Sequence, residues 1–172
     1  MSTAIASPAA APLGDATRER FAREVAKYPA DQTQSAVMAC LSIVQQEQGW
    51  VSPASEKAVA DYLGMPVMAV HEVTTFYSMY NQKPVGRFKL NVCTNAPCMF
   101  AGGPEALRHL CGKLGVEPYG TTADGQFTVQ PSECLGACGD APVMLVNDRH
   151  MCSFMSNDKL DQLVDGLRQA ED

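Results

Sequence analysis

Four of the seven cysteines in this 172-residue chain fall into two close pairs. Four residues separate Cys93 from Cys98, three separate Cys134 from Cys138, and 35 lie between the pairs. Without a secretory signal, grouped cysteines hold metal more often than they form disulfides, and thiolates are preferred ligands of zinc and of iron–sulfur clusters. The two pairs are therefore the first candidates for chemistry.

A cluster of two irons and two sulfides needs four thiolates, two for each iron, so each cysteine pair would serve one iron. Two ferric ions, two sulfides and four thiolates form a dianion, which one electron turns into a trianion. The small residues Gly136, Ala137 and Gly139 would let backbone N–H groups approach the sulfurs and offset this charge. Because Glu133 and Asp140 add negative charge beside the second pair, the pattern predicts a low-potential one-electron carrier.

Other chemical roles for these cysteines agree less well with their spacing. Zinc remains the alternative metal, although zinc sites usually place two residues between paired cysteines and both spacers here are longer. A dithiol oxidoreductase would need Cys-x-x-Cys after its first strand, and that motif is absent. The remaining cysteines and the histidines have no ligand partner at short spacing, so we expect packing or solvated roles for Cys40, Cys111, Cys152, His71, His109 and His150.

The elements predicted for residues 86–172 bring the two pairs together. Alternation over 88–92 predicts a half-buried strand that ends at Cys93, and a helix over 104–114 leads to a second strand that ends just before Cys134. Strands joined by a single helical crossover run parallel, so both pairs should lie at the same carboxyl edge of the sheet.

Two further strands and a helix complete this half of the chain. The apolar run 143–146 predicts a central strand buried on both faces, and Asn147 and Asp148 predict a turn into an edge strand that runs through Phe154. Asn157 is expected to cap a last helix. A βαβ crossover followed by a hairpin and a helix is the layout of a thioredoxin-like fold.

Residues before this region show helical spacing, with helix limits set by proline and glycine. The expected helices run from Asp15 to Pro29, over 33–48, from Ser52 to Gly64, and from Pro66 to about Tyr80. We predict an α+β chain with a disordered tail (1–14), a helical bundle (15–85) and a thioredoxin-like α/β domain that carries the cluster (86–172).

Composition excludes several classes of function. Thirteen Lys and Arg against nineteen Asp and Glu give a net charge of -6, which argues against nucleic acid or anionic lipid as the main partner. No apolar run approaches the ~20 residues that cross a bilayer, so we expect a soluble chain. It also lacks the glycine-rich fingerprints for NAD and ATP, so hydride chemistry would need a site on another subunit.

The runs 92–99 and 133–142, together with 49–51 and 75–80, closely resemble the family of 2Fe-2S subunits of NADH:quinone oxidoreductase (respiratory complex I), whose members are thioredoxin-like 2Fe-2S ferredoxins. The resemblance covers nearly everything after the tail. Phe100 and Ala101 depart from it, because many relatives carry Leu and Arg there, so any contact of that arginine is not carried over.

The resemblance implies a 2Fe-2S cluster on Cys93, Cys98, Cys134 and Cys138 and an oxidoreductase role as a one-electron carrier. It also implies a flavoprotein partner that binds NADH and FMN, further subunits of the complex, and a cytoplasmic position peripheral to the inner membrane without direct insertion. The equivalent diaphorase subunit of an NAD-linked formate dehydrogenase or bidirectional hydrogenase is the alternative. A zinc-stabilised interaction module is a remote one.

Overall fold

The computed structural model describes residues 13–170, which combine helices with a five-stranded sheet, so the predicted α+β class is confirmed. The chain divides into two compact units, a helical unit (1–84) and a sheet unit (85–172). Of the predicted tail, only Leu13 and Gly14 fall within the described residues. The domain limits 15–85 and 86–172 stay a prediction. Among residues 13–170, no helix has both the length and the apolar character needed to span a bilayer.

The helical unit contains the four predicted helices, although α1 and α4 end earlier than expected and the second helix begins with a 3-10 turn. Its elements are α1 (Asp15–Val25), a 3-10 turn (Thr33–Ala36), α2 (Val37–Gln48), α3 (Pro53–Leu63) and α4 (Val67–Phe76). Gly49 and Gly64 end α2 and α3 in the left-handed conformation, and the Ser52 hydroxyl accepts the Ser55 N–H at the start of α3. The apolar stripes of these helices meet in one core around Phe21 and Leu41.

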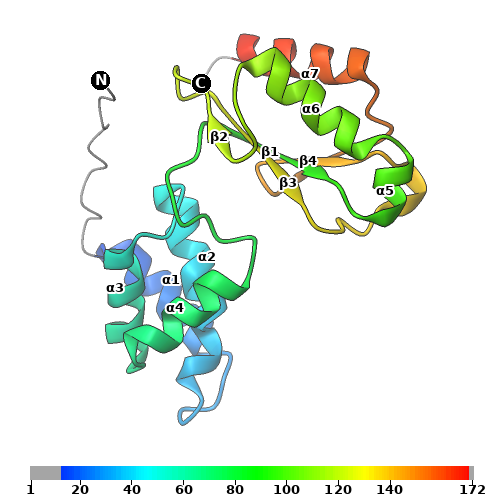
Figure 1. Cartoon of the computed structure of the whole chain (residues 1–172). Helices are drawn as coiled ribbons and strands as arrows, with labels where there is room; N and C mark the ends of the chain where they lie inside the picture. The colour runs from blue at the N-terminus through cyan, green and yellow to red at the C-terminus, as the bar shows by residue number, and fades with distance from the viewer. Residues whose placement is uncertain (1–12, 171–172) are drawn as a thin grey trace. The chain divides into compact units, whose positions relative to one another are not determined.

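The sheet unit has the predicted crossover, with two short elements that periodicity did not predict, α5 and β2. Its elements are β1 (Phe88–Cys93), α5 (Ala96–Phe100), α6 (Gly103–Leu114), β2 (Gly120–Thr121), β3 (Phe127–Ser132), a 3-10 turn (Cys138–Asp140), β4 (Met144–Val146), β5 (His150–Cys152) and α7 (Asn157–Gln169). The strand order is β2-β3-β1-β4-β5, and β1 and β3 run parallel. Helices α6 and α7 lie side by side over one face of this sheet (Figure 1).

Two burial predictions for the strands are wrong. All six residues of β1 are buried, because β1 is the central strand and its polar face is covered as well as its apolar face. On that polar face, Asp148 accepts a hydrogen bond from Asn91 Nδ2 at 2.6 Å and lies 2.6 Å from Lys89 Nζ. Strand β4 instead alternates, since Leu145 lies on the face opposite α6 and α7 and is only half-buried.

The hairpin after β4 forms as predicted up to its second strand. Asn147 and Asp148 have φ values of 52° and 56°, the left-handed conformations of a type I′ turn, and the Arg149 N–H closes this turn on Val146 O at 3.1 Å. Strand β5 pairs antiparallel with β4 at the sheet edge but ends at Cys152. Phe154 is therefore not part of the strand, and its backbone is left-handed with φ 53°.

Candidate metal centre

The first cysteine pair lies in the interior at the carboxyl end of β1. Cys93 is the last residue of β1, and Cys98 lies on the short helix α5 that follows. Asn95 caps α5 by accepting the Ala96 N–H at 2.9 Å. Both thiols are buried, with 2% of Cys93 and 1% of Cys98 exposed.

The second pair lies in the loop after β3 and is exposed. The sulfurs of Cys134 and Cys138 are 3.9 Å apart. Gly136 has a φ of 76°, a left-handed conformation in which its N–H points at Cys134 Sγ from 3.4 Å. The predicted approach of a backbone amide to sulfur is therefore present at this loop.

Parallel pairing of β1 with β3 places the two loops against each other. Cys93 is the register partner of Ser132, and the next amide, that of Thr94, donates to Ser132 O at 3.1 Å. Asn95 Nδ2 donates to Glu133 Oε2 at 2.9 Å and so joins the two ligand loops directly. Cys93 and Cys98 also pack in one cluster with Leu135 and Ala137 of the second loop.

Neighbouring thiols oppose the ionisation of Cys98 and Cys138 at this edge. The pKa of Cys98 is raised, first by burial and further by the thiols of Cys93 and Cys138, while a backbone hydrogen bond at Val143 acts in the opposite direction. The pKa of Cys138 is raised mainly by the adjacent Cys134 thiol, and Cys93 contributes to the same effect. Because metal ligands must be thiolates, a bound metal would supply the cationic charge that favours ionisation of Cys98 and Cys138.

The spacing within the second pair fits tetrahedral sulfur coordination. Metal–sulfur bonds of about 2.3 Å at a tetrahedral angle put two sulfurs about 3.8 Å apart, and Cys134 and Cys138 are separated by 3.9 Å. Within residues 13–170, no three His, Cys, Asp or Glu side chains already converge on one metal position. The arrangement is two pairs of thiols, and a two-iron cluster uses two thiolates on each iron.

Three residues support this site in ways that were not predicted from the sequence. Gly103 opens α6 so close to the first pair that a Cβ there would lie 2.5 Å from the carbonyl oxygen of Cys93 and 2.9 Å from that of Cys98. Val143 accepts the Cys93 N–H at 3.1 Å, and Asn95 bridges the loops. Only Asn95 had a sequence signal, the Asn-x-Pro pattern of a helix start.

The other cysteines and histidines lie outside the site, as expected. Cys40 is buried in the helical core, where burial raises its pKa to about 12, and Cys111 and Cys152 pack against the core of the sheet unit. His71 Nδ1 lies 3.0 Å from Glu56 Oε2, and His109 Nε2 lies 2.8 Å from Asp161 Oδ1. The remaining histidine, His150, is exposed.

Comparison with curated proteins finds close relatives over most of the chain. It is 40% identical over 143 residues to NADH-quinone oxidoreductase subunit 2 of Thermus thermophilus, covering 83% of this chain and 79% of that protein. It is also 40% identical over 154 residues to an NADH-quinone oxidoreductase subunit of Rhizobium meliloti, covering 90% of each chain. These relatives are subunits of an oxidoreductase complex, as the sequence resemblance predicted.

A solved structure of an NAD+-reducing [NiFe]-hydrogenase has the same fold, with a TM-score of 0.68 at 21% identity over 79% of this chain. The match spans only 23% of the hydrogenase chain. The family model described as thioredoxin-like [2Fe-2S] ferredoxin matches residues 21–168. This match confirms the cofactor predicted from cysteine spacing, a 2Fe-2S cluster rather than zinc. The chain therefore belongs to the family of thioredoxin-like [2Fe-2S] ferredoxins.

Proposed function

We propose that this chain is the one-electron carrier subunit of an NADH:quinone oxidoreductase, with its cluster held by Cys93, Cys98, Cys134 and Cys138. The observation that carries the proposal is the meeting of both cysteine pairs at one sheet edge, in a chain 40% identical to named subunits of that enzyme. When bound, the cluster supplies the exchange of one electron at a time.

The two cysteine pairs would have different roles in this exchange. Cys93 and Cys98 are buried, with Gly103 at the start of α6 packed against their backbone, so they would anchor one iron away from water. Cys134 and Cys138 are exposed, so they would present the other iron to a redox partner. The Gly136 N–H, aimed at Cys134 Sγ, would offset part of the negative charge there.

The partner in this proposal is a flavoprotein subunit that binds NADH and FMN, since the sequence of this chain has no dinucleotide fingerprint. Further subunits would complete the complex and hold the chain at the cytoplasmic face of the inner membrane as a peripheral component. The diaphorase module of a formate dehydrogenase or hydrogenase is the alternative assembly. Copurification with a molybdenum or nickel enzyme, instead of quinone-linked membrane subunits, would identify it.

The decisive test starts with purified chain reconstituted with iron and sulfide. We expect two irons and two acid-labile sulfides per chain, and an EPR signal that appears only on reduction. Added NADH should produce that signal only when the FMN-loaded flavoprotein subunit is also present. Zinc without sulfide, or a cluster that NADH and the flavoprotein do not reduce while dithionite does, would contradict the proposal.

A further inference from the structure

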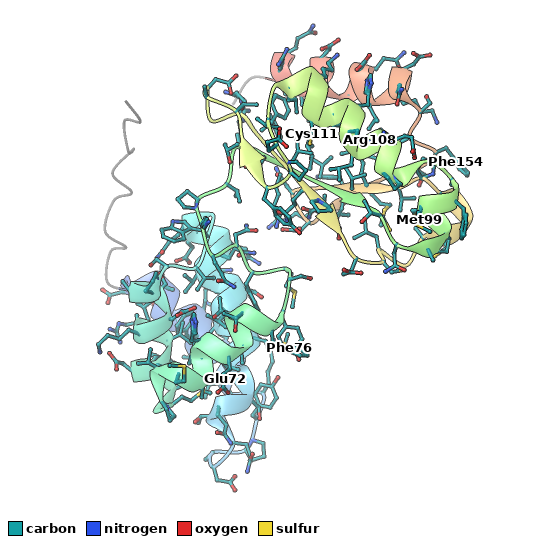
Figure 2. The ribbon with its side chains drawn as sticks, viewed as in Figure 1. Glu72, Phe76, Met99, Arg108, Cys111 and Phe154 are labelled. Atoms are coloured by element: carbon teal, nitrogen blue, oxygen red, sulfur yellow. The ribbon has the colours of Figure 1, made fainter. Side chains whose placement is uncertain are left out.

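One side of α4 and the segment after it exposes large apolar side chains on the helical unit. Phe76 is 80% exposed and Met68 64%, and Tyr77 and Met79 extend this surface beyond the end of the helix. Glu72 lies between Met68 and Phe76 at the four-residue spacing that places all three on one stripe. Figure 2 shows Glu72 and Phe76 on the same side of α4. We call Met68, Glu72, Phe76, Tyr77 and Met79 the α4 face.

The α4 face is held in place by the fold. The Phe76 and Tyr77 rings meet edge to face with centroids 5.0 Å apart. The Met79 carbonyl accepts a hydrogen bond from Gln45 Nε2 at 2.8 Å, and the next residue, Tyr80, is buried with its hydroxyl donating to Met38 O. An exposed aromatic surface fixed in this way loses little conformational freedom on binding, which suits it to anchor a protein partner.

Charge indicates which kind of partner fits. Among the described residues, Glu72 forms no ion pair, and the α4 face contains no lysine or arginine. The nearest basic side chain in sequence, His71, is directed to Glu56. A carboxylate within an apolar surface is complementary to a surface that places Arg or Lys beside an apolar hollow.

The Glu72 carboxylate disfavours two other binding partners for the α4 face, a second copy of this chain and an anionic membrane. In a two-fold dimer the α4 face would pack against itself and bring two Glu72 carboxylates together without a cation. An anionic lipid surface would repel Glu72 and a chain of net charge -6. A different protein with a basic residue at its apolar site is the occupant that remains consistent with these charges.

The short connection between the two units points to the redox partner itself. The Asn81 N–H donates to Gln45 of the helical unit, and the Gly86 N–H donates to Thr128 of the sheet unit. Only residues 82–85 lie between these anchors, so the five residue steps from Asn81 to Gly86 span at most about 18 Å. Two units tethered so closely would bind one large neighbour, and attachment through one unit raises the local concentration of the other.

We propose that the α4 face docks on the flavoprotein subunit, into an apolar hollow bordered by Arg or Lys, and so keeps the cluster-bearing unit at its electron partner. This inference rests on the function proposed above. It assigns to the helical unit, which carries none of the proposed cluster ligands, the role of an anchor.

The test measures binding of cluster-loaded full chain to purified FMN-loaded flavoprotein subunit by biolayer interferometry. Phe76→Ser should weaken binding at least about 30-fold, which corresponds to about 2 kcal/mol, because it removes an aromatic anchor. Glu72→Lys should weaken binding at least about tenfold and reduce its dependence on salt. Matched controls outside α4, Tyr28→Ser and Asp31→Lys, alter an exposed aromatic and an exposed carboxylate and should stay within about twofold of the parent.

Each variant is also checked by circular dichroism and cluster absorbance, which should match the parent because the altered side chains are exposed. If Phe76→Ser loses helicity, Phe76→Leu and Glu72→Gln are measured in place of Phe76→Ser and Glu72→Lys. Each should weaken binding by about threefold or more. Folded variants that bind like the parent would overturn the inference and leave the proposed function standing. A parent chain that does not bind the flavoprotein overturns both, and a dimer abolished by Phe76→Ser would identify a second copy as the occupant instead.

Discussion

At the scale of single residues, the site depends on backbone groups as much as on its sulfurs. The Gly136 N–H reaches Cys134 Sγ, and Val143 contributes backbone hydrogen bonds to both cysteines of the first pair. Fixed backbone dipoles can offset the charge of an anionic cluster without bringing a mobile cation into the site. The fold therefore controls the surroundings of the cluster through the path of its loops.

Gly103 is the position where a single methyl group should matter most. Gly103→Ala would force a Cβ to within 2.5 Å of Cys93 O, so we expect a loss of about 1–3 kcal/mol in the free energy of unfolding and less iron per chain. Gly112→Ala is the matched control on the same helix, because a Cβ there meets nothing within 4 Å.

Chemical denaturation and iron analysis of both variants check this prediction. Gly112→Ala should keep the parental iron content and gain roughly 0.5–1 kcal/mol, since alanine restricts the unfolded chain and favours helix. Equal iron content and stability in the two variants would show that α6 does not need its close approach to the cysteine carbonyls.

At the scale of elements, α6 and α7 are joined by apolar packing and by a charged group at their surface. His109 Nε2 lies 2.8 Å from Asp161 Oδ1, and Lys113 Nζ lies 3.2 Å from the same oxygen. The pKa of Asp161 is lowered, mainly by the hydrogen bond from His109 and further by Lys113. The pKa of Lys113 is raised by its contacts with Asp161 and Asp165, which outweigh the opposing effect of desolvation.

This pairing predicts a pH-dependent contribution to stability. A carboxylate whose pKa is lower in the folded state stabilises the fold above its ordinary value of 3.8, and that contribution is lost as the pH falls through the folded pKa. Asp161→Asn should therefore have a lower Tm than the parent at pH 7, by a small amount because the side chain is only partly buried and solvent screens it.

Thermal unfolding between pH 7 and pH 3 tests whether the stabilisation by Asp161 is lost toward low pH. The gap in Tm between parent and Asp161→Asn should narrow below about pH 3.8. Glu72→Gln, at an exposed carboxylate with no ion pair in the described range, should follow the parent throughout. A gap that widens toward low pH would contradict the assignment.

At the scale of the whole molecule, the two units have separate hydrophobic cores. Because all four proposed ligands lie in the sheet unit, we predict that cluster loss destabilises that unit alone. Calorimetry of the cluster-loaded chain should show two transitions, and Cys134→Ser should lower only one of them.

Leu41→Ala provides the reciprocal control. Leu41 is fully buried in the helical core, so its truncation should cost about 2–5 kcal/mol and lower the other transition. One transition that shifts with either substitution would show that the chain unfolds as one cooperative body, and the predicted domains would have to be abandoned.

The helix ends and the parallel pairing of β1 with β3 could be predicted because both follow from interactions that are local in the sequence. Glycine ends helices through its own backbone preference, so the ends of α2 and α3 at Gly49 and Gly64 could be inferred from the sequence. A crossover helix makes its two strands parallel, so the meeting of the cysteine loops could also be inferred. The α5 helix was missed because a five-residue helix is too short to show a period.

The amino-acid sequence by itself determined the cysteine spacing, the cofactor, and the order of the helices and strands apart from α5 and β2. Only the tertiary structure decided that β1 is buried on both faces, that one cysteine pair is buried and the other exposed, and that Gly103 packs against the first pair. The physical reason is that spacing and periodicity reflect interactions between chain neighbours. Burial depends on which distant segments pack together, as when Asp148 of the hairpin covers Lys89 and Asn91.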